Sequence, residues 1–222
     1  MSDASGVAYE AALRGAPTAY VVDDDESIRA LWRWLMESND IAVQTFANAA
    51  SFIAAYRGGD PGCLVLDLRL PGMSGLELQA YLRERGIEIP IVFVTGHGDV
   101  PTAVSALKQG AVDFIQKPFG YREVLAVIRK AFERDAELRG RRARSTQIST
   151  RYASLSERER EVMTRVADGK LNKIIAAELG ISVKTVEFHR AHVMHKMAVA
   201  SVAELVQQLL ELSGHRAHAG RG

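Results

Sequence analysis

Short apolar runs alternate with stretches of helical periodicity through the first two thirds of the chain. Several runs are apolar throughout, which is typical of strands buried on both faces of a parallel sheet. The predicted strands are residues 19–22, 41–46, 63–66, 91–95 and 112–115. The predicted helices follow them at about 26–36, 48–57, 76–85, 101–109 and from 121 to 132 or beyond. Asp25 can cap the first of these helices, Asn48 begins the second, and Ser74 with Glu77 has the spacing of a capping box before the third. Five such βα units predict an α/β fold with a doubly wound, five-stranded parallel sheet.

The pattern is purely helical from Ser156 onward. Ser156 with Glu159, and Ser201 with Glu204, have the spacing of capping boxes, and Asn172 and Ser182 begin two helices between them. These signals predict an all-α, four-helix domain of the helix-turn-helix type. The predicted organisation is a loose tail (1–16), a sheet domain (17–134), a helical segment that frays into a linker (135–152), a helical domain (153–213) and a disordered tail (214–222).

The overall composition excludes few classes of protein, but charge is distributed unevenly along the chain. Residues 139–222 hold 15 Lys+Arg and 8 Asp+Glu, a net charge of +7, while the preceding residues are acidic. A basic domain of this kind suggests a polyanionic partner. The single cysteine, Cys63, lies in a predicted strand, which excludes a disulfide framework and favours a reducing cytoplasm. Because no apolar run approaches the length of a membrane span, we expect a cytoplasmic protein without membrane contact.

Polar residues stand at the ends of the predicted strands. Because the carboxyl ends of parallel strands share one edge of the sheet, these residues can meet although they are distant in sequence. They are Asp23, Asp24, Asp67, Thr95 and Lys117. Three clustered carboxylates repel one another unless a cation lies among them, and a donor set made only of oxygen favours Mg²⁺. Acidic groups that are merely solvated at loop ends are the simpler alternative.

Four motifs occur in order: Val-Val-Asp23-Asp24, Leu-Asp67-Leu-Arg-Leu-Pro-Gly, Val-Thr95-Gly-His-Gly, and Asp-Phe114-Ile-Gln-Lys117-Pro. Together they resemble the receiver domain of two-component response regulators. The resemblance implies that Asp67 accepts a phosphoryl group from a sensor histidine kinase. It also implies that Asp23, Asp24, Asp67 and the Arg69 carbonyl surround Mg²⁺, with Thr95 and Lys117 beside the phosphoryl group.

The same resemblance implies a conformational switch. Thr95 would move toward the phosphorylated aspartate and Phe114 would turn inward, although Phe114 is equally compatible with an ordinary core residue. The Lys117–Pro118 peptide bond is cis in that family. Arg69 and His97 flank the phosphoacceptor, either as residues that tune the lifetime of the phosphate or as surface side chains.

The helix predicted from Val183 to Met197 has two distinct faces. Its inward face carries Val186, His189, Val193 and Met197, and its outward face carries Lys184, Glu187, Phe188, Ala191 and His195. His189, His192 and His195 are spaced three residues apart, but no carboxylate or thiol completes a zinc set with them, so we reject a metal site there. The outward side chains suit base edges in a major groove, with Phe188 able to contact a thymine methyl group.

The stretches Leu155-Ser-Glu-Arg-Glu-Arg-Glu161, Gly169 to Ser182, and Thr185-Val-Glu-Phe-His-Arg190 resemble the LuxR-type DNA-binding domain. Its combination with a receiver is similar to the NarL/FixJ class, with Glu187-Phe-His-Arg190 nearest the FixJ-type branch. The resemblance implies that Asn172 and Lys173 lie near the DNA backbone and that Thr185 and Arg190 contact phosphate. On the outward face itself, Lys184 can reach a guanine edge or a phosphate, and Glu187 can accept from cytosine N4. Many relatives have lysine where Glu187 stands, so base preferences cannot be transferred. Many also have arginine where Val202 stands, so we expect one phosphate contact to be missing. A four-helix protein-binding module is the alternative.

The sequence therefore predicts a transcription regulator that is not an enzyme. Phosphorylation of Asp67 would favour a homodimer, through the fourth helix, fifth strand and fifth helix of the receiver, and the dimer would bind double-stranded DNA. One alternative is a regulator whose DNA-binding domain is free at all times. Another is a phosphohydrolase of the haloacid dehalogenase type, although Arg69 stands where such enzymes generally have a second aspartate.

Overall fold

The computed structural model describes residues 15–56, 58–96 and 107–219, with side chains to residue 213. The chain forms two compact units, Met1–Arg139 and Gly140–Gly222, which we describe separately. The predicted helix 101–109 and the position of His97 lie mostly outside the described residues, as do the first 14 residues and Arg57.

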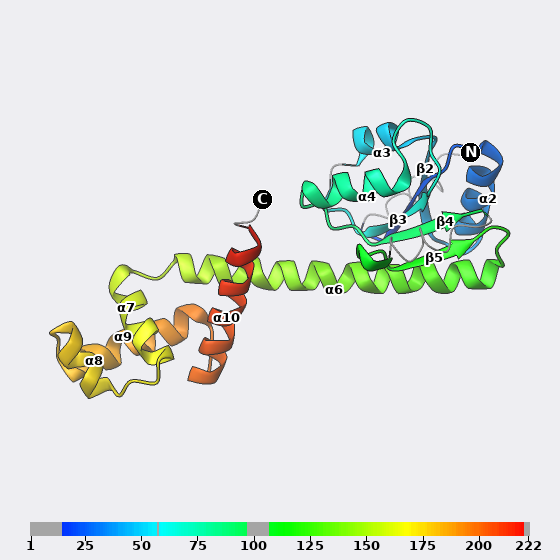
Figure 1. The fold of residues 1–222 in the computed structure, drawn as a ribbon. Coiled ribbons are helices and arrows are strands. Elements are labelled where there is room, and N and C mark those ends of the chain that lie inside the picture. The colour runs from blue at the N-terminus through cyan, green and yellow to red at the C-terminus, as the bar shows by residue number, and fades with distance from the viewer. Residues whose placement is uncertain (1–14, 57, 97–106, 220–222) are drawn as a thin grey trace, which may run out of the picture. The chain divides into compact units, whose positions relative to one another are not determined.

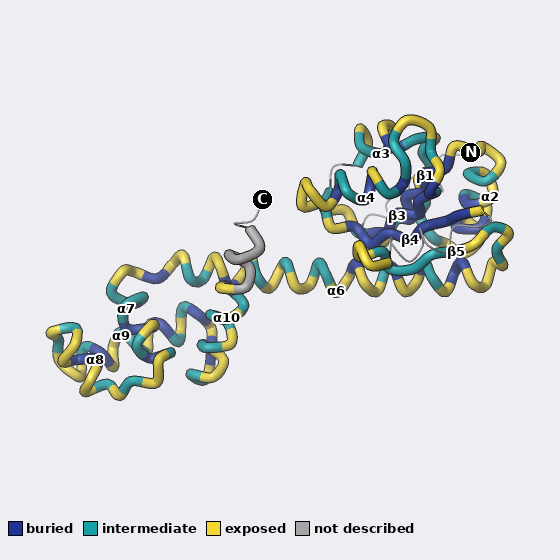
Figure 2. The backbone as a smooth tube through the Cα atoms, viewed as in Figure 1, coloured by how far each residue is buried: buried dark blue, intermediate teal, exposed yellow. Residues whose placement is uncertain are grey.

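The N-terminal unit is built on a five-stranded parallel sheet (Figure 1). Its strands are β1 (Thr18–Val22), β2 (Ala42–Phe46), β3 (Gly62–Asp67), β4 (Ile91–Thr95) and β5 (Asp113–Gln116). Their order in the sheet is β2-β1-β3-β4-β5, with every neighbouring pair parallel. The doubly wound sheet predicted from the apolar runs is therefore confirmed, and the strands that were apolar throughout are its central, buried ones (Figure 2).

Helices cover both faces of this sheet. They are α2 (Glu26–Glu37), α3 (Ala49–Ala55), α4 (Gly75–Glu84) and the first part of α6 (Tyr121–Ala153). Alternate residues of each strand enter two separate cores. One core joins strand residues such as Val65 to α2 and α6, and the other joins strand residues such as Leu66 to α3 and α4. Cys63 is fully buried in the first core, and burial raises the pKa of its thiol, which stays protonated.

The predicted helix caps are present. Asp25 accepts a hydrogen bond from the Ser27 N–H and caps α2, while Asn48 caps α3. Ser74 and Glu77 form a complete capping box at the start of α4. This box fixes where the chain leaves the loop after β3, and so it positions the residues that follow Asp67.

Helix α6 differs from its prediction. Residues 135–152 were expected to fray into a linker, but the helix is continuous to Ala153. In the C-terminal unit Ile148 is buried in the core and Tyr152 packs against it, so this end of the helix is stabilised by tertiary contacts. In the N-terminal unit the buried carboxylate of Asp135 accepts a hydrogen bond from the Gly62 N–H at 3.1 Å, which attaches α6 to the beginning of β3.

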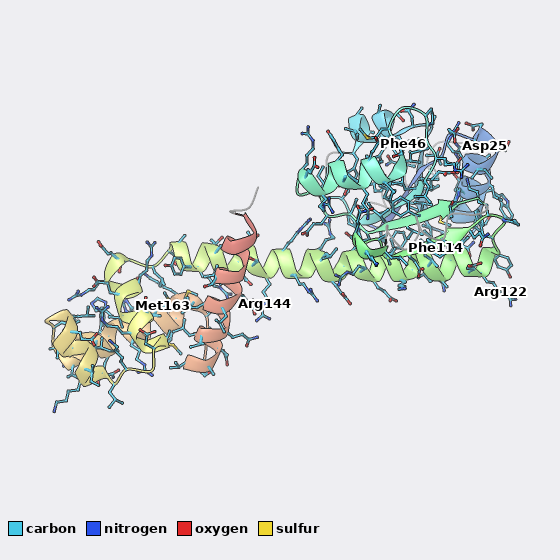
Figure 3. All side chains as sticks on the ribbon, in the orientation of Figure 1. Asp25, Phe46, Phe114, Arg122, Arg144 and Met163 are labelled. Atoms are coloured by element: carbon cyan, nitrogen blue, oxygen red, sulfur yellow. The ribbon has the colours of Figure 1, made fainter. Side chains whose placement is uncertain are left out.

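The C-terminal unit packs the end of α6 with four further helices around a third core (Figure 1). They are α7 (Glu157–Ala167), α8 (Asn172–Leu179), α9 (Val183–Met197) and α10 (Val202–Ala219). Ser156 and Glu159 form the predicted capping box, and Ser182 caps α9. Helix α10 continues to Ala219, whereas a disordered tail was predicted from Gly214 onward. Figure 3 shows Met163 of α7 inside this unit, where it is buried.

Candidate functional site

The carboxyl edge of the sheet brings together the acidic residues predicted to meet there. Single carboxylate oxygens of Asp23, Asp24 and Asp67 all lie within 4.8 Å of one another. Lys117 joins this cluster from the segment after β5, with its Nζ 2.7 Å from Asp23 Oδ2 and 2.6 Å from Asp67 Oδ2. One ammonium group thus bridges the ends of β1 and β3, and the Lys117–Pro118 peptide bond is cis.

The cluster carries more negative than positive charge. Burial raises the pKa of Asp23, because the hydrogen bonds from Lys117 and the Asp25 N–H only partly offset the loss of solvent. Burial alone would lower the pKa of Lys117, but its hydrogen bonds to Asp23 and Asp67 raise it, so the ammonium form is favoured. Three carboxylates against one ammonium group leave a site that favours a further cation.

The donor set fits a hard divalent cation. Its ligands are carboxylate oxygens, and within the described parts of the chain no histidine or cysteine joins the cluster. The three carboxylates differ in exposure, since Asp23 is buried, Asp67 is half-buried and Asp24 is exposed. An oxygen-only site that is open on one side suits Mg²⁺, which keeps several of its waters in proteins.

Thr95 and Phe114 occupy the positions that the sequence predicted. Thr95 is buried at the end of β4, and its hydroxyl donates to the Gly96 carbonyl at 3.3 Å rather than to the acidic cluster. Its own carbonyl accepts from the Lys117 N–H at 2.7 Å, which joins β4 to the lysine segment. Phe114 lies on β5 (Figure 3), partly buried against the core that contains Phe93.

Three further residues support the acidic cluster. The Arg69 N–H donates to Asp67 Oδ1 at 2.8 Å, which orients that carboxylate. The Arg29 guanidinium donates to the Asp23 carbonyl at 2.6 Å and holds the loop that carries Asp23 and Asp24. At Gly75 an added Cβ would lie 2.4 Å from the Asp67 carbonyl oxygen, so only glycine fits. The roles of Arg29 and Gly75 were not predicted, because neither contact has a local sequence signal.

The outward face of α9 in the C-terminal unit is accessible, as predicted. Lys184, Glu187, Phe188 and Ala191 are exposed, and Ser182 caps the helix through the Thr185 N–H at 3.0 Å. The inward residues Val186, Val193 and Met197 are buried, whereas His189 is only partly so.

The residues predicted to lie at the DNA backbone come from two helices. Lys173 is exposed on α8, and Arg190 of α9 donates to Asn172 Oδ1 at 3.1 Å. Val202 is partly buried and packs against the core. The pair formed by Arg190 and Asn172 therefore fixes α9 against the beginning of α8.

Each of the two units matches a known protein family. Residues 19–129 match the response regulator receiver domain, and residues 153–209 match the bacterial regulatory proteins of the luxR family. The fold and the acidic site thus define a receiver domain joined to a LuxR-type helix-turn-helix domain.

Relatives with both domains show the family. The transcriptional regulatory protein FixJ of Azorhizobium caulinodans is 44% identical over 86% of this chain and 90% of its own length. The response regulator protein TodT of Pseudomonas putida is 43% identical over 86% of this chain and 85% of its own length. This protein therefore belongs to the two-component response regulators with a LuxR-type DNA-binding domain, and it is similar to the FixJ-type members.

Solved structures give the same result. The response regulator StyR superposes with a TM-score of 0.79 at 43% identity, covering 88% of this chain and 99% of StyR. Full-length FixJ from B. japonicum gives a TM-score of 0.55 at 41% identity, covering 89% of this chain and 97% of that protein. Within the described residues, no helix is both long and apolar enough to cross a membrane.

Proposed function

We propose that Asp67 is phosphorylated by a sensor histidine kinase and that phosphorylation promotes dimerisation and sequence-specific DNA binding. The observation that carries this proposal is the Lys117 ammonium group, which binds Asp23 and Asp67 at once. An Asp67 carboxylate oxygen would attack phosphorus, forming a P–O bond as the P–N bond to the kinase imidazole breaks. Lys117 would neutralise charge on the transferred group, and the buried Thr95 hydroxyl would turn from Gly96 to donate to it.

Mg²⁺ fits the same site. Asp23, Asp24, Asp67 and the Arg69 carbonyl would hold it, and the ion would supply positive charge that lowers repulsion between the carboxylates and the incoming phosphoryl group. The chain's own residues keep Asp67 oriented through the Arg69 N–H, while its side chain stays partly accessible to the donor.

The C-terminal unit supplies the output. Its net positive charge and the accessible N-terminal turns of α9 support insertion of that helix into a major groove. Lys184, Glu187 and Phe188 would read base edges, while Lys173, Thr185 and Arg190 would contact the backbone with Asn172. Two units in a dimer would occupy half-sites about one turn of DNA apart. We further propose that Thr95 and Phe114 link the phosphorylated site to the dimerising surface.

Beryllofluoride, which mimics a bound phosphoryl group, tests the first step. With Mg²⁺ present, it is expected to increase the dimer fraction of the full chain in analytical ultracentrifugation. Asp67→Asn and Lys117→Met should abolish or reduce that increase. The matched control is Asp40→Asn, which removes an exposed carboxylate in the turn between α2 and β2 and should leave the response intact. An unchanged dimer fraction in the wild-type chain would contradict the proposal.

Two alternatives give different results. A regulator whose DNA-binding unit is always free would bind DNA equally well with and without beryllofluoride, and Asp67→Asn would still activate its promoter. A phosphohydrolase would release inorganic phosphate from small phosphomonoesters over many turnovers, and Asp67→Asn would stop that release.

A further inference from the structure

Phe188 presents an exposed aromatic side chain on the outward face of α9. Its side chain is 57% exposed in the second turn of α9. One turn later, the imidazole ring of His192 lies against it, with ring centroids 4.1 Å apart and an interplanar angle of 45°. A free phenylalanine would lose rotamer freedom on binding a partner, which costs free energy. The contact with His192 limits that freedom before any partner arrives.

His192 is in turn directed by a buried carboxylate on the neighbouring helix. Its Nδ1 lies 3.7 Å from Glu159 Oε1, and the Glu159 side chain is only 5% exposed. The other oxygen of Glu159, Oε2, accepts from Lys196 Nζ at 2.7 Å and from the Ser156 N–H at 2.8 Å. The Glu159 carboxylate is therefore fixed in place, with Oε1 turned toward the imidazole. At 3.7 Å the contact is too long for a hydrogen bond, but it becomes an ion pair when the imidazole is protonated.

The groups around His192 carry both signs of charge. The charged and titratable groups near it are Glu159 from α7 and, within about one turn on α9 itself, His189, Arg190, His195 and Lys196. Lys196 is engaged by Glu159 and by the Ser154 carbonyl before α7, and Arg190 is held by Asn172 of α8. Glu159 and the Phe188 ring are thus the two groups that hold the His192 imidazole, while the His189 ring contacts Phe188 less closely, with ring centroids 5.7 Å apart.

We propose that His192 is a positioning residue for DNA reading: its ring, held between Glu159 and Phe188, fixes the Phe188 side chain for contact with a thymine methyl group. DNA affinity and preference for thymine then depend on His192 as well as on Phe188. This inference rests on the proposed DNA-binding function. It adds a specificity residue that does not itself touch a base.

The first experiment uses the full chain without DNA. Phenylalanine rings are labelled with ¹³C, and the resonances of Phe188 are assigned by their loss in Phe188→Leu. In the wild-type chain these resonances should show nuclear Overhauser contacts with the His192 ring and ring-current shifts away from random-coil positions. His192→Gln should move the Phe188 resonances toward random-coil positions, whereas His195→Gln, a matched exposed histidine on the same helix, should leave them unchanged. Phe188 resonances that lack the His192 contacts in the wild type, or that His192→Gln leaves in place, would overturn the proposal.

The second experiment measures DNA affinity and the recognition of thymine. Duplexes are enriched from a randomised pool with the beryllofluoride-treated full chain, and affinity is then measured for the wild type and for His192→Gln. His192→Gln should weaken binding about two- to fivefold, as expected when one more side chain must be ordered on binding. Replacing the contacted thymine by uracil, which removes only the methyl group, should abolish the difference between the wild type and His192→Gln.

A Phe188→Ala background identifies how His192 acts. If His192 works through the Phe188 ring, His192→Gln has no further effect in that background. An undiminished effect there would mean that His192 contacts phosphate directly, and the proposal would be wrong. Failure of any duplex to enrich would contradict the proposed DNA-binding function, while the resonances of the free chain would still decide whether His192 positions Phe188.

Discussion

Glu159→Gln provides a direct test of how the C-terminal unit is held together. The Glu159 side chain is 5% exposed and accepts hydrogen bonds from Lys196 and from Ser156 at the beginning of α7. Burial alone would raise the pKa of this carboxyl group, but these hydrogen bonds lower it from 4.5 to about 2. A difference of this size corresponds to about 3 kcal/mol of stability. We expect Glu159→Gln to remove most of that stabilisation, because the amide is neutral.

The pH dependence has a definite sign. A carboxyl group whose pKa is lower in the folded state stabilises the fold above its unfolded pKa, and this stabilisation is lost as pH falls through the folded pKa. The difference in stability between the wild type and Glu159→Gln should therefore be full above about pH 4.5 and decline toward about pH 2. A difference that stays constant across this window would refute the reasoning.

The positions of the tryptophans allow the assay to use the full chain. The sequence has 2 tryptophans, and both, Trp32 and Trp34, lie on α2 of the N-terminal unit. In urea denaturation, tryptophan fluorescence thus follows that unit alone, while far-ultraviolet circular dichroism follows both. Glu159→Gln should lower the midpoint of the C-terminal unit, which is seen in circular dichroism, and leave the fluorescence midpoint of the N-terminal unit unchanged. The control Glu161→Gln removes a partly exposed pair with Arg158 and should cost at most about 1 kcal/mol.

Three further substitutions test other parts of the fold by the same denaturation assay. Gly75→Ala should destabilise the N-terminal unit by about 1–3 kcal/mol, because the new methyl group meets the Asp67 backbone, and an unchanged fluorescence midpoint would contradict this. Asp135→Ala removes the acceptor of the Gly62 N–H and should also cost about 1–3 kcal/mol, visible as a lower fluorescence midpoint. Gly140 lies within α6 with open space around it, and glycine is less favourable than alanine inside a helix, so Gly140→Ala should instead stabilise the chain by about 0.5–1 kcal/mol. A loss of stability in this variant would contradict the prediction.

The sequence predicted those parts of the fold that depend on local patterns. Continuous apolar runs predicted the central strands, and the capping boxes at Ser74 and Ser156 predicted the first turns of α4 and α7. The acidic cluster also followed, since the ends of parallel strands must share an edge, and Lys117 meets Asp23 and Asp67 there.

Contacts between distant segments could not be predicted in the same way. Nothing near Asp135 in the sequence indicates that its carboxylate meets Gly62, 73 residues away. Likewise, the capping role of Glu159 was evident from Ser156, but its contacts with Lys196 and His192 depend on how α7 packs on α9. The end of α6 was predicted to fray because its residues are mostly polar, yet tertiary contacts of Ile148 keep it helical.

The alternation of side chains along β3 has a consequence for insertions and deletions. Cys63 and Val65 enter one core, while Leu64 and Leu66 enter the other. Losing one residue from this strand would exchange the two sets and withdraw Asp67 by about 3.3 Å from Lys117. The number of residues in β3, counted from Gly62, therefore sets the position of the Asp67 carboxylate. Changes in chain length are better tolerated beyond the strand than within it.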